Sequence, residues 1–207
     1  NGEEYIDLAH TMLKVKLKRA KAGGTSLKND SVAPVDNILH SLFSQVDVLL
    51  NQKPVTTSRN TNAHRAYSET LFNYGYDARV SHLLLPLFYG DEENKMEEPP
   101  VAGANGSINS RAYIFNDGVS VELMGLLHCD VFSQQKFLLN GVGMKVCLVR
   151  AKDDVCLLYH TKDQNYRARI QEATLFVRRA KLSPSILLGH TKALVKTIAK
   201  YPLTRVE

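Results

Sequence analysis

Apolar and polar residues alternate with a period of two in several stretches of the chain, and this pattern predicts β-strands. Over residues 13–18, leucine and valine alternate with three lysines, which indicates a strand with one buried and one solvated face. The lysines are therefore interpreted as a solvent-facing row, and charges of this kind also protect an edge strand from unwanted pairing. Residues 46–50 alternate in the same way, and Asn51-Gln52-Lys53-Pro54 predicts a turn back into Val55.

Further strands are expected in the second half of the chain. Residues 119–124 and 142–149 repeat the alternation. Residues 166–182 are rich in β-branched, aromatic and basic side chains, a composition that favours a strand. Because this stretch is long for one strand, we expect a β-bulge within it.

Two segments have helical periodicity instead. Over residues 62–79, apolar side chains recur every three or four residues, which predicts one helix with Asn62 as its N-cap and Gly75 near its end. Ser183-Pro184 is a helix start signal, and the apolar positions behind it predict a helix of roughly four turns. An extended pattern resumes over residues 201–205.

The remaining segment, residues 91–110, combines acids, prolines, glycines and polar residues and predicts a long surface loop. Many short strands, two helical insertions and no regular βαβ alternation indicate a mainly antiparallel β protein. A sandwich or a jelly roll fits this pattern best, and residues 1–207 are interpreted as a single domain.

Composition supports a folded domain and limits its class. Hydrophobic residues make up 44% of the chain and charged residues 23%, values that argue against extensive disorder. No apolar run approaches the ~20 residues of a membrane helix, so no membrane span is expected. The three cysteines, Cys129, Cys147 and Cys156, are interpreted as reduced thiols that act as small core residues.

The formal net charge of +5 is unevenly distributed. Residues 91–98 carry five acids and one lysine, a local net charge of −4. Residues 145–207 carry 13 basic and five acidic residues, a local net charge of +8. A basic half indicates either a polyanion partner or a solvated surface.

Motifs for catalysis or metal binding are weak. The Gly141-Val142-Gly143 pair lacks a third glycine and precedes a strand, and the chain has neither a phosphate-binding loop nor a Gly-x-Ser-x-Gly motif. The gaps between Cys147, Cys156 and His160 do not suit structural zinc. His128-Cys129-Asp130 is not expected to be catalytic, because neighbouring residues of a strand point to opposite faces. No catalytic, metal or cofactor site is predicted.

One electrostatic candidate remains, in the predicted strand 166–182. Tyr166 and Phe176 are interleaved there with basic residues that are candidates for a polyanion or subunit contact: Arg167, Arg169, Arg178, Arg179 and Lys181. Arginine and aromatic side chains together can bind single-stranded nucleic acid. Contact of this kind would be weak and mostly nonspecific phosphate attraction.

Several motifs, in order over nearly the whole chain, resemble those of one protein family. They are Leu39–Val48 (LHSLFSQVDV), Arg65-Ala66-Tyr67 with Glu69-Thr70-Leu71, Phe137–Val142 (FLLNGV), Leu148-Val149-Arg150, Leu175–Arg179 (LFVRR), Ser183-Pro184-Ser185 and Tyr201-Pro202. These motifs are similar to those of the major capsid proteins of Polinton (Maverick) elements and the related adintoviruses.

The resemblance implies a double jelly-roll major capsid protein, in which two eight-stranded sandwiches stand side by side and three chains form a pseudo-hexagonal capsomer. This chain would supply the first sandwich. Its expected fold class is therefore a mainly β, eight-stranded antiparallel jelly-roll sandwich with two helical insertions. The chain begins at Asn1 rather than at methionine and stops at Glu207 within a polar–apolar pattern, so we interpret it as a piece of a longer protein with a second jelly roll.

The leading hypothesis is a structural capsid protein of a virus or a transposable element, not an enzyme. Its partners would be copies of itself and other capsid proteins, and its location the virion, assembled inside the host cell. The loop 91–110 would lie on an outer surface or at a subunit contact, and the uneven charge would steer assembly.

Two other classes remain open. One is a basic β-sandwich that binds nucleic acid, for example a host-adopted capsid relative. The other is a sugar-binding jelly roll, which is less favoured because the chain has no tryptophan to stack on a sugar.

Overall fold

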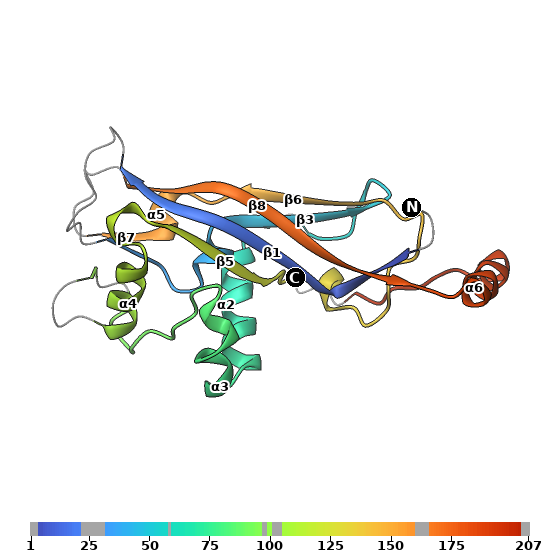
Figure 1. The fold of residues 1–207 in the computed structure, drawn as a ribbon, viewed down its shortest axis with the longest axis horizontal. Helices are drawn as coiled ribbons and strands as arrows, with labels where there is room; N and C mark the ends of the chain where they lie inside the picture. Colours follow the sequence, from blue (N-terminus) through green and yellow to red (C-terminus); the bar gives the residue numbers. More distant parts are fainter. Residues whose placement is uncertain are drawn as a thin grey trace.

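The structure is a computed structural model that describes residues 4–21, 32–57, 59–96, 99–100, 105–159 and 166–203. The molecule is elongated, with its longest strands running along the long axis (Figure 1). The helices α2, α3 and α4 lie on one side of the strands, and α6 lies at one end, beyond them (Figure 1). The architecture is mainly β with antiparallel sheets, as the alternation predicts.

The largest sheet has the strand order β5-β1-β8 and is called the β1 sheet below. It consists of β1 (Glu4–Lys21), β5 (Ser120–Leu126) and β8 (Tyr166–Lys181). The apolar residues of the predicted strand 13–18 are buried and its lysines are half-buried on the opposite face. β1 is the central strand, so the expectation that its lysines protect an edge is wrong for the folded protein.

The bulge expected in the long basic strand is present. The pairing of β1 with β8 shifts register between Asp7 and Met12 and again between Lys16 and Leu17. At the second shift, Lys16 lies opposite Glu172 while Leu17 lies opposite Ile170. One extra residue, Gln171, is thereby accommodated in β8, which is the usual construction of a β-bulge.

Two smaller sheets complete the set. One pairs β2 (Val32–Pro34) with β7 (Leu157–Tyr159), and the other has the order β4-β3-β6. The latter consists of β3 (Phe43–Leu50), β4 (Lys53–Pro54) and β6 (Met144–Arg150). The predicted turn joins β3 to β4, and Asn51 and Gln52 both have positive φ there, 47° and 67°, as a two-residue hairpin turn requires.

The pairing between strands is nested along the chain. β1 pairs with β8, β2 with β7 and β3 with β6, all antiparallel. Pairs of this kind describe a long antiparallel ribbon that is folded back at its middle. The segment between β4 and β5 holds most of the helices and occupies that middle.

The core combines residues from all three sheets, including Leu13, Val15, Val48, Leu123 and Leu157. Cys129 and Cys156 belong to the same core and Cys147 is half-buried; all three are free thiols. Burial raises the pKa of Cys129 to about 12 and that of Cys156 to about 11. The interpretation of the cysteines as core residues therefore holds for two of the three.

The predicted helix 62–79 is two helices. α2 spans Asn62–Asn73 and α3 spans Tyr76–Arg79, with extended backbone at Tyr74 between them. Thr61 is the N-cap of α2. The Asn62 side chain instead donates hydrogen bonds to the carbonyl oxygens of His40 and Phe43, at 3.2 and 3.0 Å. These bonds attach the start of α2 to the four-residue helix α1 (Ile38–Ser41) and to β3.

The prediction that residues 91–110 form a surface loop is wrong for both of its ends. Asp91 is bound by the fully buried Arg111, at 2.8 Å, and Asn105 is also fully buried. Asn105 caps the helix α4 (Gly106–Ile114) by accepting a hydrogen bond from the backbone N–H of Ser107. Residues 97–98 and 101–104 of this segment lie outside the described residues.

Arg111 is the centre of a buried ionic cluster, named the Arg111 cluster below (Arg111, Asp36 and Asp91). Its guanidinium donates two hydrogen bonds to Asp91, at 2.8 and 3.0 Å, and one to the Pro34 carbonyl oxygen. Asp36 lies 3.4 Å from the same guanidinium and accepts hydrogen bonds from the backbone N–H groups of Tyr89 and Gly90. The cluster ties α4 to β2 and to the chain after η1 (His82–Leu84).

The remaining short elements are η2 (Asn116–Gly118), η3 (Asp130–Ser133) and α5 (Asp153–Cys156). The final helix, α6 (Pro184–Lys196), begins where Ser183-Pro184 predicts it, with Ser183 as the N-cap. None of its side chains is buried. After α6, residues 201–203 are not part of a strand, and Arg205, the end of the expected extended pattern, lies outside the described residues. Among the described helices, none is long and apolar enough to cross a membrane.

Candidate functional site

The five basic candidates of β8 occupy two separate places. Arg167 and Arg169 lie at the start of the strand, and residues 178–181 lie at its end. At about 3.3 Å per residue, Arg169 and Arg178 are roughly 30 Å apart. The structure therefore does not bring the candidates together into one patch.

The outer face of the β1 sheet changes character along its length. Exposed Met12 lies between Leu126 and Phe176 in the strand register, which makes an apolar row. The next rows are charge-balanced: Lys14 is 2.9 Å from Glu122, and Lys16 lies between Glu122 and Glu172 in register. These acids compensate the lysines of β1 at the centre of the sheet.

The far end of the same face is basic. Lys18 lies opposite Arg169 on β8, and Arg167 follows two residues along. Both arginines are exposed. Tyr166 is buried against Lys21 and Tyr159, so its ring is not available to stack on a base. Only the phosphate-binding part of the predicted nucleic-acid contact is thus geometrically supported at this end.

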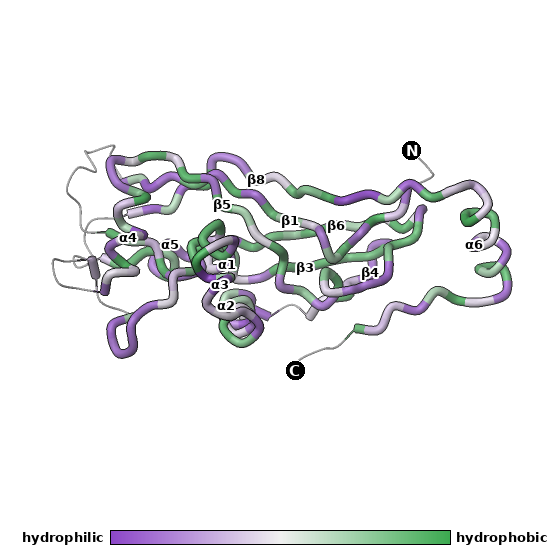
Figure 2. Tube along the Cα trace, turned by 60° about the horizontal axis from the view of Figure 1, so that its bottom comes forward, coloured by the Kyte–Doolittle hydropathy of each residue, from purple (hydrophilic) through white to green (hydrophobic). Residues whose placement is uncertain are grey.

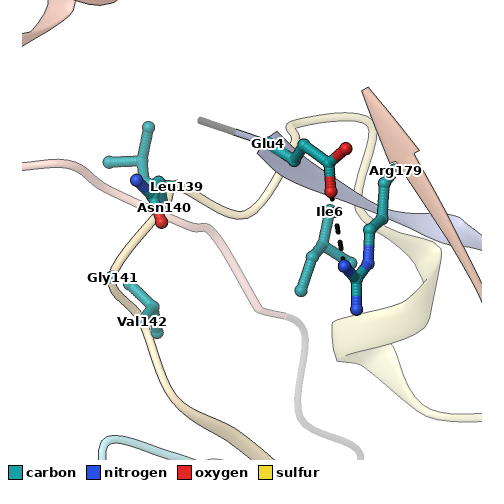
Figure 3. Close-up of a pocket in the computed structure, with 7 residues that line it drawn as sticks. All are labelled: Glu4, Ile6, Leu139, Asn140, Gly141, Val142 and Arg179. Carbon is teal, nitrogen blue, oxygen red and sulfur yellow. Dashed lines mark hydrogen bonds and ion pairs between the residues drawn. The ribbon is translucent and has the colours of Figure 1, made fainter. Parts of the chain in front are cut away.

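At the opposite end of β8, two of the arginines have acidic partners on β1. Arg179 lies 3.3 Å from Glu4, and Arg178 lies 3.7 Å from Asp7. Figure 3 shows the Glu4–Arg179 pair across from the segment Leu139–Val142, with a shallow cavity of about 310 Å³ between them. These pairs reduce the positive potential that this end would present to a polyanion.

A larger cavity, of about 540 Å³, lies between α2, the residues after β4 and the residues after β5. Four charged or titratable side chains at its wall form the Arg65 cluster (Arg65, Glu69, His128 and Asp130). Arg65 donates hydrogen bonds to Asp130 and to Glu69, both at 2.6 Å. The Nδ1 atom of His128 lies 2.8 Å from Glu69.

The electrostatics of this cluster follow from those contacts. The His128 hydrogen bond and the Arg65 guanidinium hold the pKa of Glu69 below its ordinary value. The two carboxylates raise the pKa of Arg65, so its charge is fixed. His40 packs edge-on against His128, with ring centroids 4.5 Å apart, and its complete burial lowers its pKa to about 3. His40 is therefore a neutral core residue.

His128, Cys129 and Asp130 all line this cavity. The expectation that they point to opposite faces of a strand is wrong, because β5 ends at Leu126. Their side chains nevertheless have separate partners, Glu69 for His128 and Arg65 for Asp130. The Cys129 thiol, with its raised pKa, is protonated at neutral pH and is a poor nucleophile.

Chemically, the cavity offers an imidazole oriented by a carboxylate and an arginine held between two acids. Sequence reasoning missed Arg65 and Glu69 as site residues. Their spacing of four on a predicted helix was the available signal, whereas nothing local in the sequence connects α2 to His128. Among the described residues, no group of three or more His, Cys, Asp or Glu side chains is placed to hold a metal ion. His160, considered with Cys147 and Cys156, lies outside them.

No family model matches the chain, and a comparison with curated proteins finds no match either.

Proposed function

We propose that this chain is a shell-forming structural protein, the jelly roll of a major capsid protein of the Polinton and adintovirus kind. The observation that carries the proposal is the nested antiparallel pairing of β1 with β8, β2 with β7 and β3 with β6. A jelly roll is an antiparallel ribbon of eight strands wrapped into two sheets. Its strands pair first with eighth, second with seventh and third with sixth.

The fourth pair of a regular jelly roll is replaced here. β4 pairs with β3, and β5 pairs with the edge of β1 that lies opposite β8. The helices α2, α3 and α4 stand between β4 and β5 in the chain, so an insertion at the bend of the ribbon accounts for the difference. The capsid-like motif Leu39–Val48 forms α1 and most of β3, and Leu39, Leu42 and Val48 are fully buried.

Large exposed apolar side chains favour a protein that works by packing against copies of itself. Phe72, Tyr76 and Tyr113 are each at least 75% exposed, on helices α2, α3 and α4. Exposed apolar side chains of this size become buried when a partner packs against them.

The proposal is tested by sedimentation velocity of the chain over a wide concentration range, followed by electron microscopy of the associated fraction. We expect reversible, concentration-dependent self-association of the chain, and we expect capsomer-like trimers only of a chain that also carries the second jelly roll. A chain that sediments as a monomer at every concentration would contradict the proposal.

A second candidate, nucleic-acid binding, is favoured by one observation, the basic end of the β1 sheet with Lys18, Arg167 and Arg169. Fluorescence anisotropy with labelled single-stranded DNA at low and moderate salt tests it. We expect weak binding that falls with salt and falls further in R167A/R169A. The matched control is R178A/R179A, which removes two arginines that already have acidic partners. Equal losses in both variants, or binding that ignores salt, would rule out this surface.

A further inference from the structure

Helix α6 has little contact with the body of the protein. Its 13 residues include no buried side chain, and an isolated helix of this length is marginal in water. It is attached at both ends: β8 leads directly into it, and Tyr201 behind it contacts the body through hydrogen bonds to Leu139 and Phe137. In between, the Tyr5 hydroxyl lies 3.0 Å from the His190 ring. Residues 184–200 are called the α6 arm below.

The α6 arm presents apolar surface on two sides. On the side facing the body, Ile186, Ala193 and Leu194 line an apolar groove of about 460 Å³ together with Phe137 and Tyr201. On the outer side, Leu188, Val195 and Ile198 are 56%, 81% and 84% exposed. Figure 2 shows α6 beyond the end of the sheets, with hydrophobic and hydrophilic positions along it. Surface of this kind needs a partner to become buried.

The arm is also uniformly basic. Residues 182–201 contain Lys192, Lys196 and Lys200 and no acid. The three lysines are exposed, and Lys136, across the groove, donates a hydrogen bond to the carbonyl oxygen of Lys200. A partner that covers the arm must therefore provide both apolar side chains and negative charge.

The chain itself provides such a surface at its other end. Residues 91–96 contain three acids and one lysine, a net charge of −2. Glu92 lies 2.9 Å from Lys95 of the same segment, and Glu92, Glu93 and Met96 are exposed. The segment is held in place by Asp91, which is bound to Arg111 of α4. α4 lies at the opposite end of the molecule from α6 in both views (Figures 1 and 2), so one copy cannot use its own segment.

From this complementarity we infer that the α6 arm docks on residues 91–96 of a second copy of the chain. Met96 occupies the apolar groove, and Glu92 and Glu93 face Lys192 and Lys196. This inference rests on the proposed shell function and specifies the contact that the shell would use. A contact between different surfaces of two copies is heterologous, so repetition closes a ring or extends an open array.

Charge reversal tests the contact by sedimentation velocity. K192E/K196E and E92K/E93K are each expected to weaken association by at least about tenfold, because like charges then face each other. The four-residue combination restores opposite charges and is expected to recover most of the association. The matched control is K53E/K145E, two exposed lysines on β4 and β6, the strands on either side of β3, which should leave association unchanged. Circular dichroism checks the fold of every variant.

Apolar substitutions provide an independent measurement. L194D, in the groove of the arm, and M96D, on the acidic segment, are each expected to weaken association. If the wild-type chain associates and neither set of reversals weakens it, the inference is wrong and the shell proposal stands. If both weaken it but the combination does not recover it, the pairing of these two surfaces is wrong. A wild-type chain that stays monomeric overturns both proposals.

Discussion

Two arginines, Arg111 on α4 and Arg65 on α2, each bind carboxylates from other parts of the chain, and their surroundings differ. Arg111 holds α4 and is fully buried, with Asp36 and Asp91 side chains 6% and 5% exposed. Arg65 holds α2 at the wall of an open cavity and is itself 29% exposed. Each guanidinium binds two carboxylates. Because the Arg111 cluster is buried, we expect it to matter most for stability. Because the Arg65 cluster is partly exposed, it is accessible to solvent and to a partner.

The energetic difference follows from desolvation. In the Arg111 cluster three charges have left water, and loss of one partner leaves the others uncompensated in a medium of low dielectric. In the Arg65 cluster water reaches each group and replaces part of a lost interaction. The same chemical pairing should therefore differ in its measured contribution to the free energy of unfolding.

The largest effect is expected from R111M. This substitution leaves Asp36 and Asp91 buried without their guanidinium and should destabilise the protein by about 3–5 kcal/mol. Urea denaturation monitored by circular dichroism measures it. The triple variant R111M/D36N/D91N removes the stranded charges and should recover part of the loss. A single-variant loss below about 1 kcal/mol would mean that α4 is held by other contacts.

The same substitution at the second site, R65M, should cost less, about 1–2 kcal/mol. It removes hydrogen bonds to Glu69 and Asp130, but both carboxylates remain accessible to water. The free energy of unfolding is compared directly with that of R111M under identical conditions. Equal losses in the two variants would show that exposure does not separate the clusters.

The smallest effect is a difference in how the clusters respond to acid. Burial raises the pKa of Asp36 above its ordinary value of 3.8, despite Arg111. A carboxyl whose pKa is higher in the folded than in the unfolded protein binds its proton more tightly in the folded state. Acidification toward pH 3.8 should therefore raise the free energy of unfolding. The pKa of Glu69 is held below 4.5. Its contribution is present above pH 4.5 and is lost as the pH falls through the folded-state pKa.

The free energy of unfolding, measured against pH in two variants, separates the contributions of Asp36 and Glu69. In D36N, the free energy of unfolding should no longer rise on acidification above pH 3.8. In E69Q, it should no longer fall below pH 4.5 because of this carboxyl. Identical pH profiles for the two variants would contradict the assignment of opposite signs.

Much of the β architecture could be predicted from the sequence, because the longer strands have their own local patterns; the three-residue strands β2 and β7 were not predicted. The lysine alternation of residues 13–18 belongs to β1, and the length of 166–182 indicated the bulge. The Ser183-Pro184 signal located the start of α6 for the same reason. Local backbone and side-chain preferences are sufficient to fix such features.

The features that could not be predicted from the sequence have a common cause: each depends on contacts between residues far apart in the chain. α4 has a largely polar sequence, and its burial depends on Asp36 and Asp91, far away in the chain. The apolar period of residues 62–79 continues across Tyr74 and Gly75, where the backbone is extended. The Arg65 cluster needs His128 and Asp130 from beyond β5. No window of neighbouring residues contains that information.

The nested pairing also has a consequence for the order of folding. During synthesis β1 emerges before β5, and β8 begins only 145 residues after the end of β1. At about 5–20 residues per second, that wait is on the order of ten seconds. Until then one side of β1 is an open edge that could pair with another nascent chain. The lysines at 14, 16 and 18, redundant as edge protection in the finished sheet, are placed to discourage such mispairing while the protein is still being made.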